Sequence, residues 1–353
     1  MSGLIAHNRP LITPADRAAV DAVLASGWIA QGPAVAALES DFVRYYGGGD
    51  ACAVSSGTAA LYLALRALGA GPGSSVAVPT YACTALLNAV IMAGATARPV
   101  DVLPESFCLD VDKMRVQASD ARIAVTVHCF GASADVASLR ALGVRVIEDC
   151  CQGLGGAFGG LPIGAAGHAA VFSFYATKIV TGGQGGMVWA PDPGVTAAVR
   201  DFRQFDGRER YEPRFNFQMT DLQAALAHSQ LGRLESIRAR RHQIAAAYLA
   251  ALPQGLAAQA GLLSLGRMVQ RFVVVAPSAA TRDALRTHMT AAGVGCIVPV
   301  ERFELLHRCL GLDPSGYAAA ERLADTTLSL PLHLSLDEDD VARVCAALRE
   351  FRP

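Results

Sequence analysis

The chain has 353 residues, of which 52% are hydrophobic and 17% are charged, and its formal net charge is −1. This composition indicates a well-buried globular protein with enough length for two domains, and it excludes a disordered chain. A chain so close to neutral lacks the basic surface that nucleic acids need. No apolar run is long enough to span a bilayer, and residues 1–10 lack the apolar core of a signal peptide. We therefore expect no nucleic-acid and no membrane partner.

The nine cysteines are scattered and form no CxxC pair and no zinc-ligand spacing. The neighbours Cys150 and Cys151 follow an apolar strand, and they are typical of small packing residues. We expect free thiols, no metal site and a cytoplasmic location, because a reducing compartment keeps cysteines unpaired.

Two helices are predicted over residues 13–45, and the glycines at 47–49 end the second one. A short buried strand, 52–54, leads through Ser55–Thr58 into an amphipathic helix over 59–69. A small polar turn before a helix can bind a phosphate, because free N–H groups and the positive end of the helix point at the anion. An ordinary strand-to-helix turn looks the same, so both interpretations stay open at this point.

The next segment alternates strands with helices, which is typical of an α/β fold with a mainly parallel sheet. Strands are predicted over 76–79, from 97, over 123–128 and over 145–148, with a helix over 84–93. Asp149 lies just beyond the last of these strands. Ligands of open α/β sheets bind at the carboxyl ends of the strands, so this carboxylate is a candidate site residue. A helix cap or a turn explains it equally well.

Lys178 lies on a turn between two apolar runs, 169–174 and 187–190, and a glycine-rich stretch, 182–186, follows it. The chain has 28 arginines but only two lysines, Lys113 and Lys178. Arginine can replace lysine as a charge, but only a lysine amine can lose its proton and form an imine with a carbonyl group. Lys178 is therefore a candidate for imine chemistry, and the alternative is an ordinary loop lysine.

The C-terminal part of the chain is predicted to form a separate, smaller domain. A capping box over Thr220–Gln223 predicts the start of one long helix that runs to about Leu252. Strands over 272–276 and 295–298 and helices over 279–292, 317–327 and 337–351 then form a small α/β domain. We expect a large cofactor-binding domain over 1–240 and a small domain over 241–353.

These pieces fit one cofactor, pyridoxal 5′-phosphate. It needs a lysine for its aldehyde, an anion site for its phosphate, and a carboxylate that keeps its ring nitrogen protonated so that the ring withdraws electrons. Lys178, Ser55–Thr58 and Asp149 supply these groups, each at the end of a predicted strand. Ser173 offers a further hydroxyl for the phosphate.

Five motifs, in order, resemble those of the DegT/DnrJ/EryC1/StrS family, the pyridoxal-phosphate-dependent sugar aminotransferases of the aspartate-aminotransferase fold, fold type I. They are SSGTAAL (55–61), VPTYACTALLNAV (78–90), EDCCQGLGG (148–156), FSFYATK with GGQGGMV (172–188) and NFQMTDLQAAL (216–226). The resemblance runs nearly end to end. It implies a large domain with a mainly parallel central sheet and a smaller C-terminal α/β domain.

The resemblance also implies a role for each matching residue. Lys178 would hold the cofactor as an imine and then move a proton between Cα of the amino donor and C4′ of the cofactor. Asp149 would pair with the ring nitrogen, and Gln152 would lie near the phenolic oxygen. The other cofactor-binding residues would be Gly57, Thr58 and Ser173 at the phosphate, Cys83 at the ring, and Asn216 at the phosphate of the neighbouring subunit.

The implied reaction is a ping-pong transfer of an amino group. Glutamate is the expected donor, and a keto-sugar, usually nucleotide-linked, is the expected acceptor. Because Asn216 would reach into the neighbouring subunit, the active unit is expected to be a homodimer with shared active sites.

The chain departs from the family pattern at several points. Cys83 stands where an aromatic residue usually stacks on the cofactor ring, Gln218 replaces a common arginine, and Arg214 replaces a usual glycine. The segment 130–144 is short, as if part of a helix were missing. These departures leave the cofactor chemistry intact, but they allow an acceptor that is not a sugar or not nucleotide-linked.

There are three alternatives to a sugar aminotransferase. A sugar dehydratase of the same family would carry histidine in place of Lys178. A non-catalytic regulatory homologue is kept open by Cys83 and Gln218. A different nucleotide-binding fold is set aside, because the chain has neither GxxxxGK[ST] nor a GxGxxG in its glycine-rich loops.

Several further polar residues are weaker candidates. His128 ends a buried strand, and a hydrogen-bonded core histidine is favoured over a role in the site. Glu148 should point away from Asp149, to the opposite face of the strand, and is expected to be structural. Arg302, Glu304 and His307 are candidates for substrate contact from the small domain.

Overall fold

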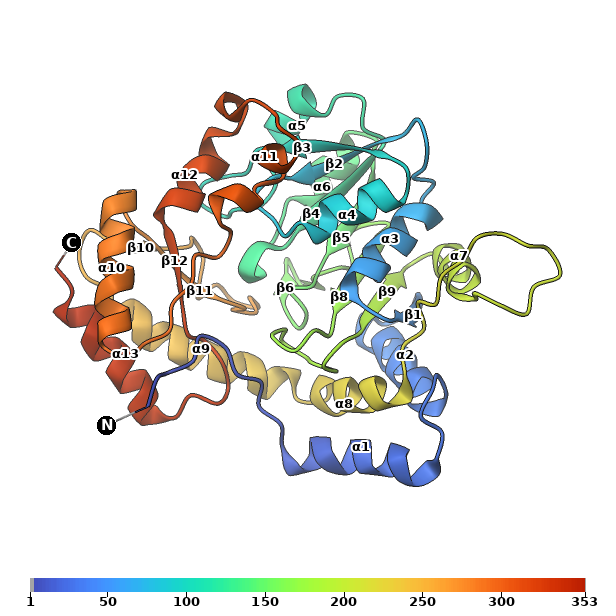
Figure 1. The fold of residues 1–353 in the computed structure, drawn as a ribbon, viewed down its shortest axis with the longest axis horizontal. Helices are drawn as coiled ribbons and strands as arrows, with labels where there is room; N and C mark the ends of the chain where they lie inside the picture. Colours follow the sequence, from blue (N-terminus) through green and yellow to red (C-terminus); the bar gives the residue numbers. More distant parts are fainter. Residues whose placement is uncertain (1–2, 353) are drawn as a thin grey trace.

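A seven-stranded sheet forms the centre of the larger lobe, in the order β1-β9-β8-β5-β4-β2-β3 (Figure 1). The computed structural model describes residues 3–352. The strands are β1 (Asp50–Val54), β2 (Ser75–Pro79), β3 (Thr96–Val100), β4 (Ile123–Val127), β5 (Arg145–Asp149), β8 (Ala169–Ser173) and β9 (Gly186–Ala190). Only β9 runs antiparallel to its neighbours, β1 and β8. The mainly parallel α/β sheet expected from the sequence is confirmed.

Helices cover both faces of this sheet, which explains why its strands are apolar almost throughout. The helices of the large lobe are α1 (Pro14–Ser26), α2 (Pro33–Tyr46), α3 (Gly57–Ala67), α4 (Ala85–Met92), α5 (Val111–Gln117), α6 (Val136–Ala141), α7 (Pro193–Arg203) and α8 (Asp221–Leu231). One core cluster packs α3 and α4 against the sheet, and another packs α2 and α8 against it. A hairpin of β6 (Ala157–Phe158) and β7 (Leu161–Pro162) projects between β5 and β8 along the chain.

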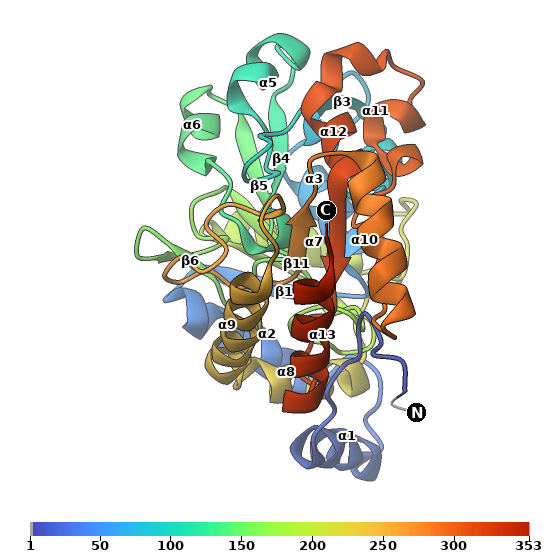
Figure 2. The same cartoon turned by 90° about the vertical axis from the view of Figure 1, so that its left-hand side faces the viewer.

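A second, antiparallel sheet forms the smaller lobe (Figure 2). Its strands are β10 (Ala257–Ala258), β11 (Phe272–Val275) and β12 (Thr327–Leu330), and its helices are α9 (Leu234–Ala251), α10 (Ala279–Ala291), α11 (Leu306–Cys309), α12 (Ala318–Thr326) and α13 (Glu338–Glu350). Short 3₁₀ turns occupy Cys129–Gly131, Arg302–Glu304 and Pro314–Tyr317. The core of this lobe includes Ile5 from the far end of the chain.

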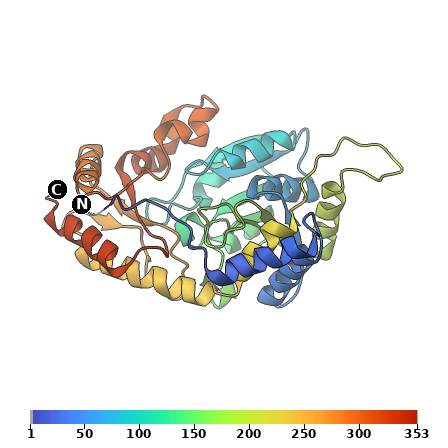
Figure 3. The same ribbon diagram turned by 60° about the horizontal axis from the view of Figure 1, so that its bottom comes forward.

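Two successive helices, α8 and α9, connect the lobes and lie nearly end to end (Figure 3). The capping box at Thr220 is confirmed, since its side chain and that of Gln223 each accept from the other's backbone N–H. The prediction of a single long helix was wrong, because α8 ends at Leu231 and a second helix, α9, begins at Leu234. Along α9, Ile237 packs in the large-lobe core and Ile244 in the small-lobe core. The domain division at residue 240 stays a prediction.

The strand predicted over 295–298 is also wrong. Only an isolated bridge joins Ile297 to Ser329 there, and the backbone of Gly295 instead bonds to Ile5 of the N-terminal segment. Within residues 3–352, no helix combines the length and the apolar character that crossing a membrane requires.

Candidate active site

A pocket of about 240 Å³ opens where the carboxyl ends of β5 and β8 meet the N-terminus of α3. All of the predicted site residues except Asn216 line it: Gly57, Thr58, Cys83, Asp149, Gln152, Ser173 and Lys178. The structure therefore brings together side chains that lie far apart in the sequence, at the edge of the sheet where α/β folds bind ligands. The roles of the individual residues stay predictions.

Lys178 lies in the turn between β8 and β9. Its backbone N–H donates to the carbonyl of Tyr175, at 2.9 Å, and the turn is fixed further along by Thr181, whose N–H donates to Gln230 Oε1 at 3.0 Å. The Lys178 amine has no hydrogen-bond or ion-pair partner among residues 3–352. A fixed backbone with an unpartnered amine in a pocket is the arrangement that imine chemistry requires.

Asp149 ends β5 and is only 5% exposed. Its Oδ1 accepts a hydrogen bond from the backbone N–H of Cys151 at 2.9 Å, and no described group donates to its Oδ2. A buried carboxylate with one open oxygen is costly unless a cationic donor meets it. The protonated ring nitrogen of pyridoxal phosphate is a donor of this kind, so Asp149 fits the cofactor.

The N-terminus of α3 forms the anion cradle that the sequence predicts. Ser56 Oγ caps the helix by accepting from Ala59 N at 3.1 Å, and the N–H groups of Gly57 and Thr58 have no partner among the described residues. A Cβ on residue 57 would come within 2.8 Å of Ser173 Cβ, so only glycine leaves this space open. Free N–H groups beside a hydroxyl at a helix start suit a phosphate.

Gln152 lines the pocket and is held in place by a backbone hydrogen bond. Its Oε1 accepts from the backbone N–H of Phe130 at 2.7 Å, which leaves its amide N–H₂ to face the pocket that it lines. Phe130 has a φ of 53°, uncommon for a residue with a side chain, and this hydrogen bond helps to hold it there. The amide can therefore donate to an oxygen of a bound ring, as the resemblance implies.

Two thiols also line the pocket, those of Cys83 and Cys151. Burial, and then the nearby charge of Asp149, hold the pKa of the Cys151 thiol well above its usual range, so it stays protonated. Cys83 is exposed to the pocket opening. Its side chain gives any bound ring less contact area than an aromatic residue would.

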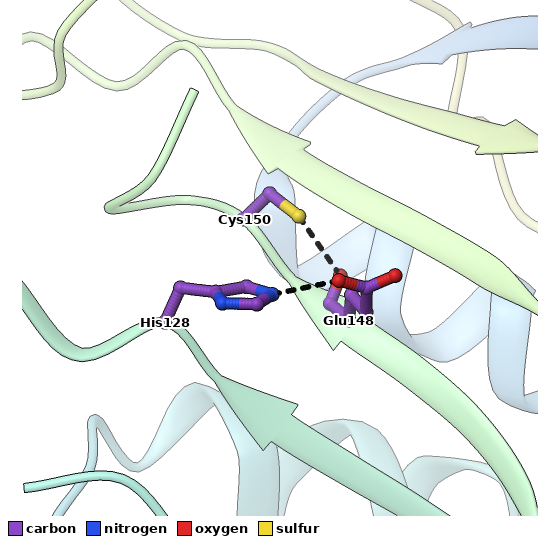
Figure 4. A group of neighbouring side chains, drawn as sticks. All are labelled: His128, Glu148 and Cys150. Carbon is purple, nitrogen blue, oxygen red and sulfur yellow. Dashed lines mark hydrogen bonds and ion pairs between the residues drawn. The ribbon is translucent and has the colours of Figure 1, made fainter. Parts of the chain in front are cut away.

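Behind the site, His128, Glu148 and Cys150 form a buried cluster (Figure 4). Glu148 accepts from His128 Nε2 at 2.9 Å and from the N–H groups of Gly164, Ala166 and Gly167. His128 Nδ1 accepts from Ala134 N at 3.2 Å, so both ring nitrogens are used. A metal ion would have to displace these bonds. The cluster is structural, as predicted for His128 and Glu148, and it fixes the strand end that carries Asp149.

Asn216 does not line the pocket of its own chain. It is exposed, and its Oδ1 accepts from the backbone N–H of Gln218 at 3.0 Å. It belongs to the segment between α7 and α8, which projects beyond α7 as a long loop in Figure 1. The predicted contact of Asn216 with a neighbouring subunit stays a prediction.

The three small-domain candidates for substrate contact are corrected by the structure. His307 is buried, with Nδ1 2.7 Å from Thr80 Oγ1 and Nε2 2.9 Å from Glu321. Arg302 forms ion pairs with acidic residues of α12, and Glu304 caps its own 3₁₀ turn. None of the three lines the pocket.

Comparison with known proteins decides the family. The sequence pattern of the DegT/DnrJ/EryC1/StrS aminotransferase family matches residues 10–349. The chain belongs to this family. The resemblance inferred from the five motifs is thereby confirmed, and the protein is an enzyme of the aminotransferase class.

Solved structures of this aminotransferase family share the fold over nearly the whole chain. The putative sugar aminotransferase Spr1654 from Streptococcus pneumoniae, in its PMP form, is 25% identical with a TM-score of 0.91, covering 98% of this chain and 97% of that one. TlmJ from Streptoalloteichus hindustanus is 30% identical with a TM-score of 0.89, covering 98% of each chain. DesV from S. venezuelae, in complex with a ketimine intermediate, is 32% identical with a TM-score of 0.86, covering 95% and 93%. Fold type I is confirmed.

Some residues that line the pocket of this aminotransferase were not predicted to belong to the site. They are Cys151, Tyr175 and Gln184. Each lies within one of the five motifs, next to or near a predicted residue, so proximity in the sequence was the available signal. Periodicity could not show which of these neighbours turn inward, because they lie on turns.

Proposed function

We propose that this aminotransferase binds pyridoxal 5′-phosphate in the pocket between Lys178 and Asp149 and transfers an amino group to a sugar. The finer proposal is that glutamate donates the amino group, that the acceptor is a nucleotide-linked keto-sugar, and that the two bind in turn. The observation that carries the proposal is the meeting of an unpartnered amine, a carboxylate with one open oxygen and an open helix N-terminus in one pocket.

Pyridoxal phosphate, when bound, supplies an aldehyde that joins to amines and a protonated ring that draws electrons from the carbon next to the joined nitrogen. Asp149 would keep the ring nitrogen protonated through its open Oδ2. Gly57, Thr58 and Ser173 would hold the phosphate, and Gln152 would donate to the phenolic oxygen. Cys83 would pack beside the ring.

Lys178 would hold the cofactor covalently through its Nζ, and the same atom would later accept and return the proton that is transferred in the reaction. In each half of the reaction, a proton has to leave or reach the carbon that bears the amino group. The only other lysine, Lys113, lies on α5 and does not line the pocket. One amine therefore serves both the donor and the acceptor, which supports the ping-pong order.

The sugar acceptor is supported by the relatives. Spr1654 is described as a putative sugar aminotransferase, and CalS13 from Micromonospora echinospora, 26% identical with a TM-score of 0.86, is described as a sugar aminotransferase. The polar residues Ser56, Tyr175 and Gln184 around the pocket suit a ligand rich in hydroxyl groups. An acceptor without a nucleotide or a sugar remains the alternative.

We also propose a homodimer with shared active sites. The loop before Asn216 carries an exposed aromatic side chain, Phe215, which is 58% exposed. Exposed aromatic residues on a fixed loop are typical of an interface. Asn216 would then reach the phosphate of the cofactor in the neighbouring subunit.

A cytoplasmic location is proposed as well. All nine cysteines are free, and several are accessible, including Cys83 and Cys309. Accessible unpaired thiols persist where the compartment is reducing.

The direct test is a half-reaction. The enzyme would be loaded with pyridoxamine phosphate and mixed with keto-sugars, free and nucleotide-linked, and the absorbance of the aldehyde form would be followed. At least one keto-sugar should restore that absorbance in the wild type and in Lys113→Ala, but not in Lys178→Ala. Equal rates in Lys178→Ala and the wild type would contradict the mechanism.

A further inference from the structure

One wall of the active-site pocket is held by few hydrogen bonds of its own. The wall is the segment 82–86, between β2 and α4, from which Ala82, Cys83, Ala85 and Leu86 line the pocket. On its α4 side, the carbonyl of Cys83 accepts from Leu86 N at 3.2 Å. The backbone N–H groups of residues 82–84 donate to no backbone group among residues 3–352. The position of this wall therefore depends on the residues that precede it.

Thr80, directly after β2, anchors the start of this wall with all of its polar groups. Its N–H donates to the carbonyl of Val100 at 2.8 Å, and its own carbonyl accepts from Leu306 N at 3.0 Å. Its Oγ1 accepts from the backbone N–H of His307 at 3.1 Å and lies 2.7 Å from His307 Nδ1. Thr80 and His307 are both fully buried, so water cannot replace these bonds.

The partner of the other ring nitrogen fixes the direction of the bond between Thr80 and His307. His307 Nε2 lies 2.9 Å from Glu321 Oε1. Burial raises the pKa of Glu321, but the hydrogen bonds from Arg308 and His307 outweigh it, so the pKa lies below its usual value. Glu321 is then a carboxylate that only accepts, so Nε2 carries the proton.

The hydroxyl group of Thr80 has two roles in this arrangement. Burial lowers the pKa of His307, against the pull of Glu321, so the ring is neutral at pH 7 and Nδ1 is an acceptor. Thr80 Oγ1 therefore donates its proton to Nδ1 while it accepts the backbone N–H of His307. Only a side chain with a hydroxyl group can do both at this position.

His307 is itself held firmly. Its ring stacks on that of Tyr317, with the centres 4.1 Å apart and the planes at 9°. The preceding residue, Leu306, packs in the core of the large lobe, and α11 lies beside the β2–β3 edge of the sheet (Figure 1). Arg308 Nη2 holds Glu321 from the other side, at 2.7 Å. His307 is thus a fixed support for Thr80.

We propose that His307 is a positioning residue, which holds the Cys83 wall of the cofactor pocket in place through Thr80. The inference rests on the proposed binding of pyridoxal phosphate. Tyr81 fixes the same turn, because its hydroxyl lies 3.0 Å from Thr327 Oγ1. A wall that is ordered before the cofactor arrives does not have to be ordered on binding, which strengthens binding. This matters more here because Cys83 offers a ring less contact area than an aromatic residue.

The first test measures the dissociation constant of pyridoxal phosphate by absorbance titration of the cofactor-free enzyme. It should rise about 10-fold in Thr80→Val, as expected for the loss of a buried hydrogen bond. Thr80→Ser, which keeps the hydroxyl, should stay close to the wild type. Thr196→Val is the matched control: Thr196 is a buried threonine of α7 whose Oγ1 lies 2.7 Å from Asp50, and it does not line the pocket. It should lose stability but keep its affinity for the cofactor.

The second test changes the other partner. His307→Leu should weaken cofactor binding about as much as Thr80→Val, whereas His307→Asn, whose amide oxygen can take the place of Nδ1, should weaken it less. In the double variant Thr80→Val with His307→Leu, the loss should not exceed that of either single variant, because both remove the same link. The visible circular dichroism of the bound cofactor should change in Thr80→Val and not in Thr196→Val.

Three outcomes would overturn the inference. They are unchanged cofactor affinity in Thr80→Val, an equal loss of affinity in Thr196→Val, and losses that add in the double variant. If Thr80→Val folds poorly, the comparison of His307→Leu with His307→Asn decides the same question, and equal affinities in these two variants would contradict the inference. If the wild-type protein does not bind pyridoxal phosphate, the proposed function itself fails, which is a different result from a wild type and a Thr80→Val variant that bind equally well.

Discussion

Asp149 and Lys178 line the same pocket because β5 and β8 are parallel neighbours, with Asp149 in register with Val171. The carboxylate ends its strand, and the lysine lies in the turn that follows the next one. The sheet therefore sets the separation between the group that would hold the ring and the amine that would hold the aldehyde. The first prediction follows from this pairing.

Replacing Asp149 with asparagine keeps the volume of the side chain and removes its charge. Turnover should fall about 100-fold or more, because the ring nitrogen would lose the carboxylate that keeps it protonated. Steady-state kinetics would measure this, and thermal unfolding should show no loss of stability, because within residues 3–352 the carboxylate accepts one hydrogen bond, from the N–H of Cys151, which the amide oxygen of asparagine can also accept. Full turnover in Asp149→Asn would refute the assigned role.

Cys83 should react with iodoacetamide in the cofactor-free enzyme and be protected after pyridoxal phosphate is added. Cys151 lines the same pocket but should stay unlabelled in both states, because burial and the charge of Asp149 hold its pKa well above the usual range. Peptide mass spectrometry would measure the labelling. Cys309, which is exposed and does not line the pocket, is the internal control and should react in both states. Equal labelling of Cys83 with and without the cofactor would place the cofactor elsewhere.

Glu148→Gln should destabilise the protein by about 3 kcal/mol at pH 7, because a buried carboxylate with several donors is replaced by an amide that cannot accept from all of them. Burial raises the pKa of Glu148, but the hydrogen bond from His128 and those from Gly167 and Gly164 outweigh it, so the pKa lies below its ordinary 4.5.

The pH dependence of this difference follows from the sign of the shift. A carboxyl group with a lowered pKa in the folded state contributes stability above its unfolded pKa and loses it as the pH falls through the folded one. Denaturant unfolding of the wild type and Glu148→Gln should therefore converge as the pH falls below 4.5. A gap between the two proteins that stays constant down to acidic pH would contradict the account of the cluster.

Arg214 stands where the family usually has glycine, and it ties the projecting loop to α7. Its Nη2 lies 2.8 Å from Asp201 and 3.0 Å from Glu212, and its guanidinium covers the ring of Phe202 at 5.3 Å. Arg214→Gly should cost only about 1 kcal/mol of global stability, because Asp201 is largely solvated. It should, however, speed proteolysis within residues 205–213. Arg210→Gly, which removes an exposed arginine of the same loop, should not speed this proteolysis. Equal cleavage of both variants would refute the role of Arg214.

The sequence predicted the core of the fold well where local patterns decide it. The strands that end at Val54, Pro79 and Asp149 were placed within two residues of their observed bounds, because each is a short apolar run closed by small or polar residues. The location of the pocket could also be predicted, because the carboxyl ends of parallel strands meet at one edge of the sheet.

The errors lie where distant contacts decide the structure. The helical pattern of α8 continues past Leu231, and the one local signal of the interruption is Gly232, whose φ of −62° is ordinary for a helix. The expected strand over 295–298 is displaced by pairing with Ile5, which enters from the other end of the chain.

Likewise, His307 resembled a substrate contact until the structure paired it with Thr80 and Glu321. Sequence spacing shows which chemical groups are available, whereas the folded chain determines which of them remain without a partner.

The most direct test of the central claim is to find where the cofactor is attached. Purified holoenzyme would be reduced with borohydride, which makes an imine bond permanent, and digested for peptide mass spectrometry. The account predicts a phosphopyridoxyl group on Lys178 in nearly every molecule and none on Lys113. Attachment at Lys113, or no attachment in an enzyme that carries the cofactor and is active, would contradict it.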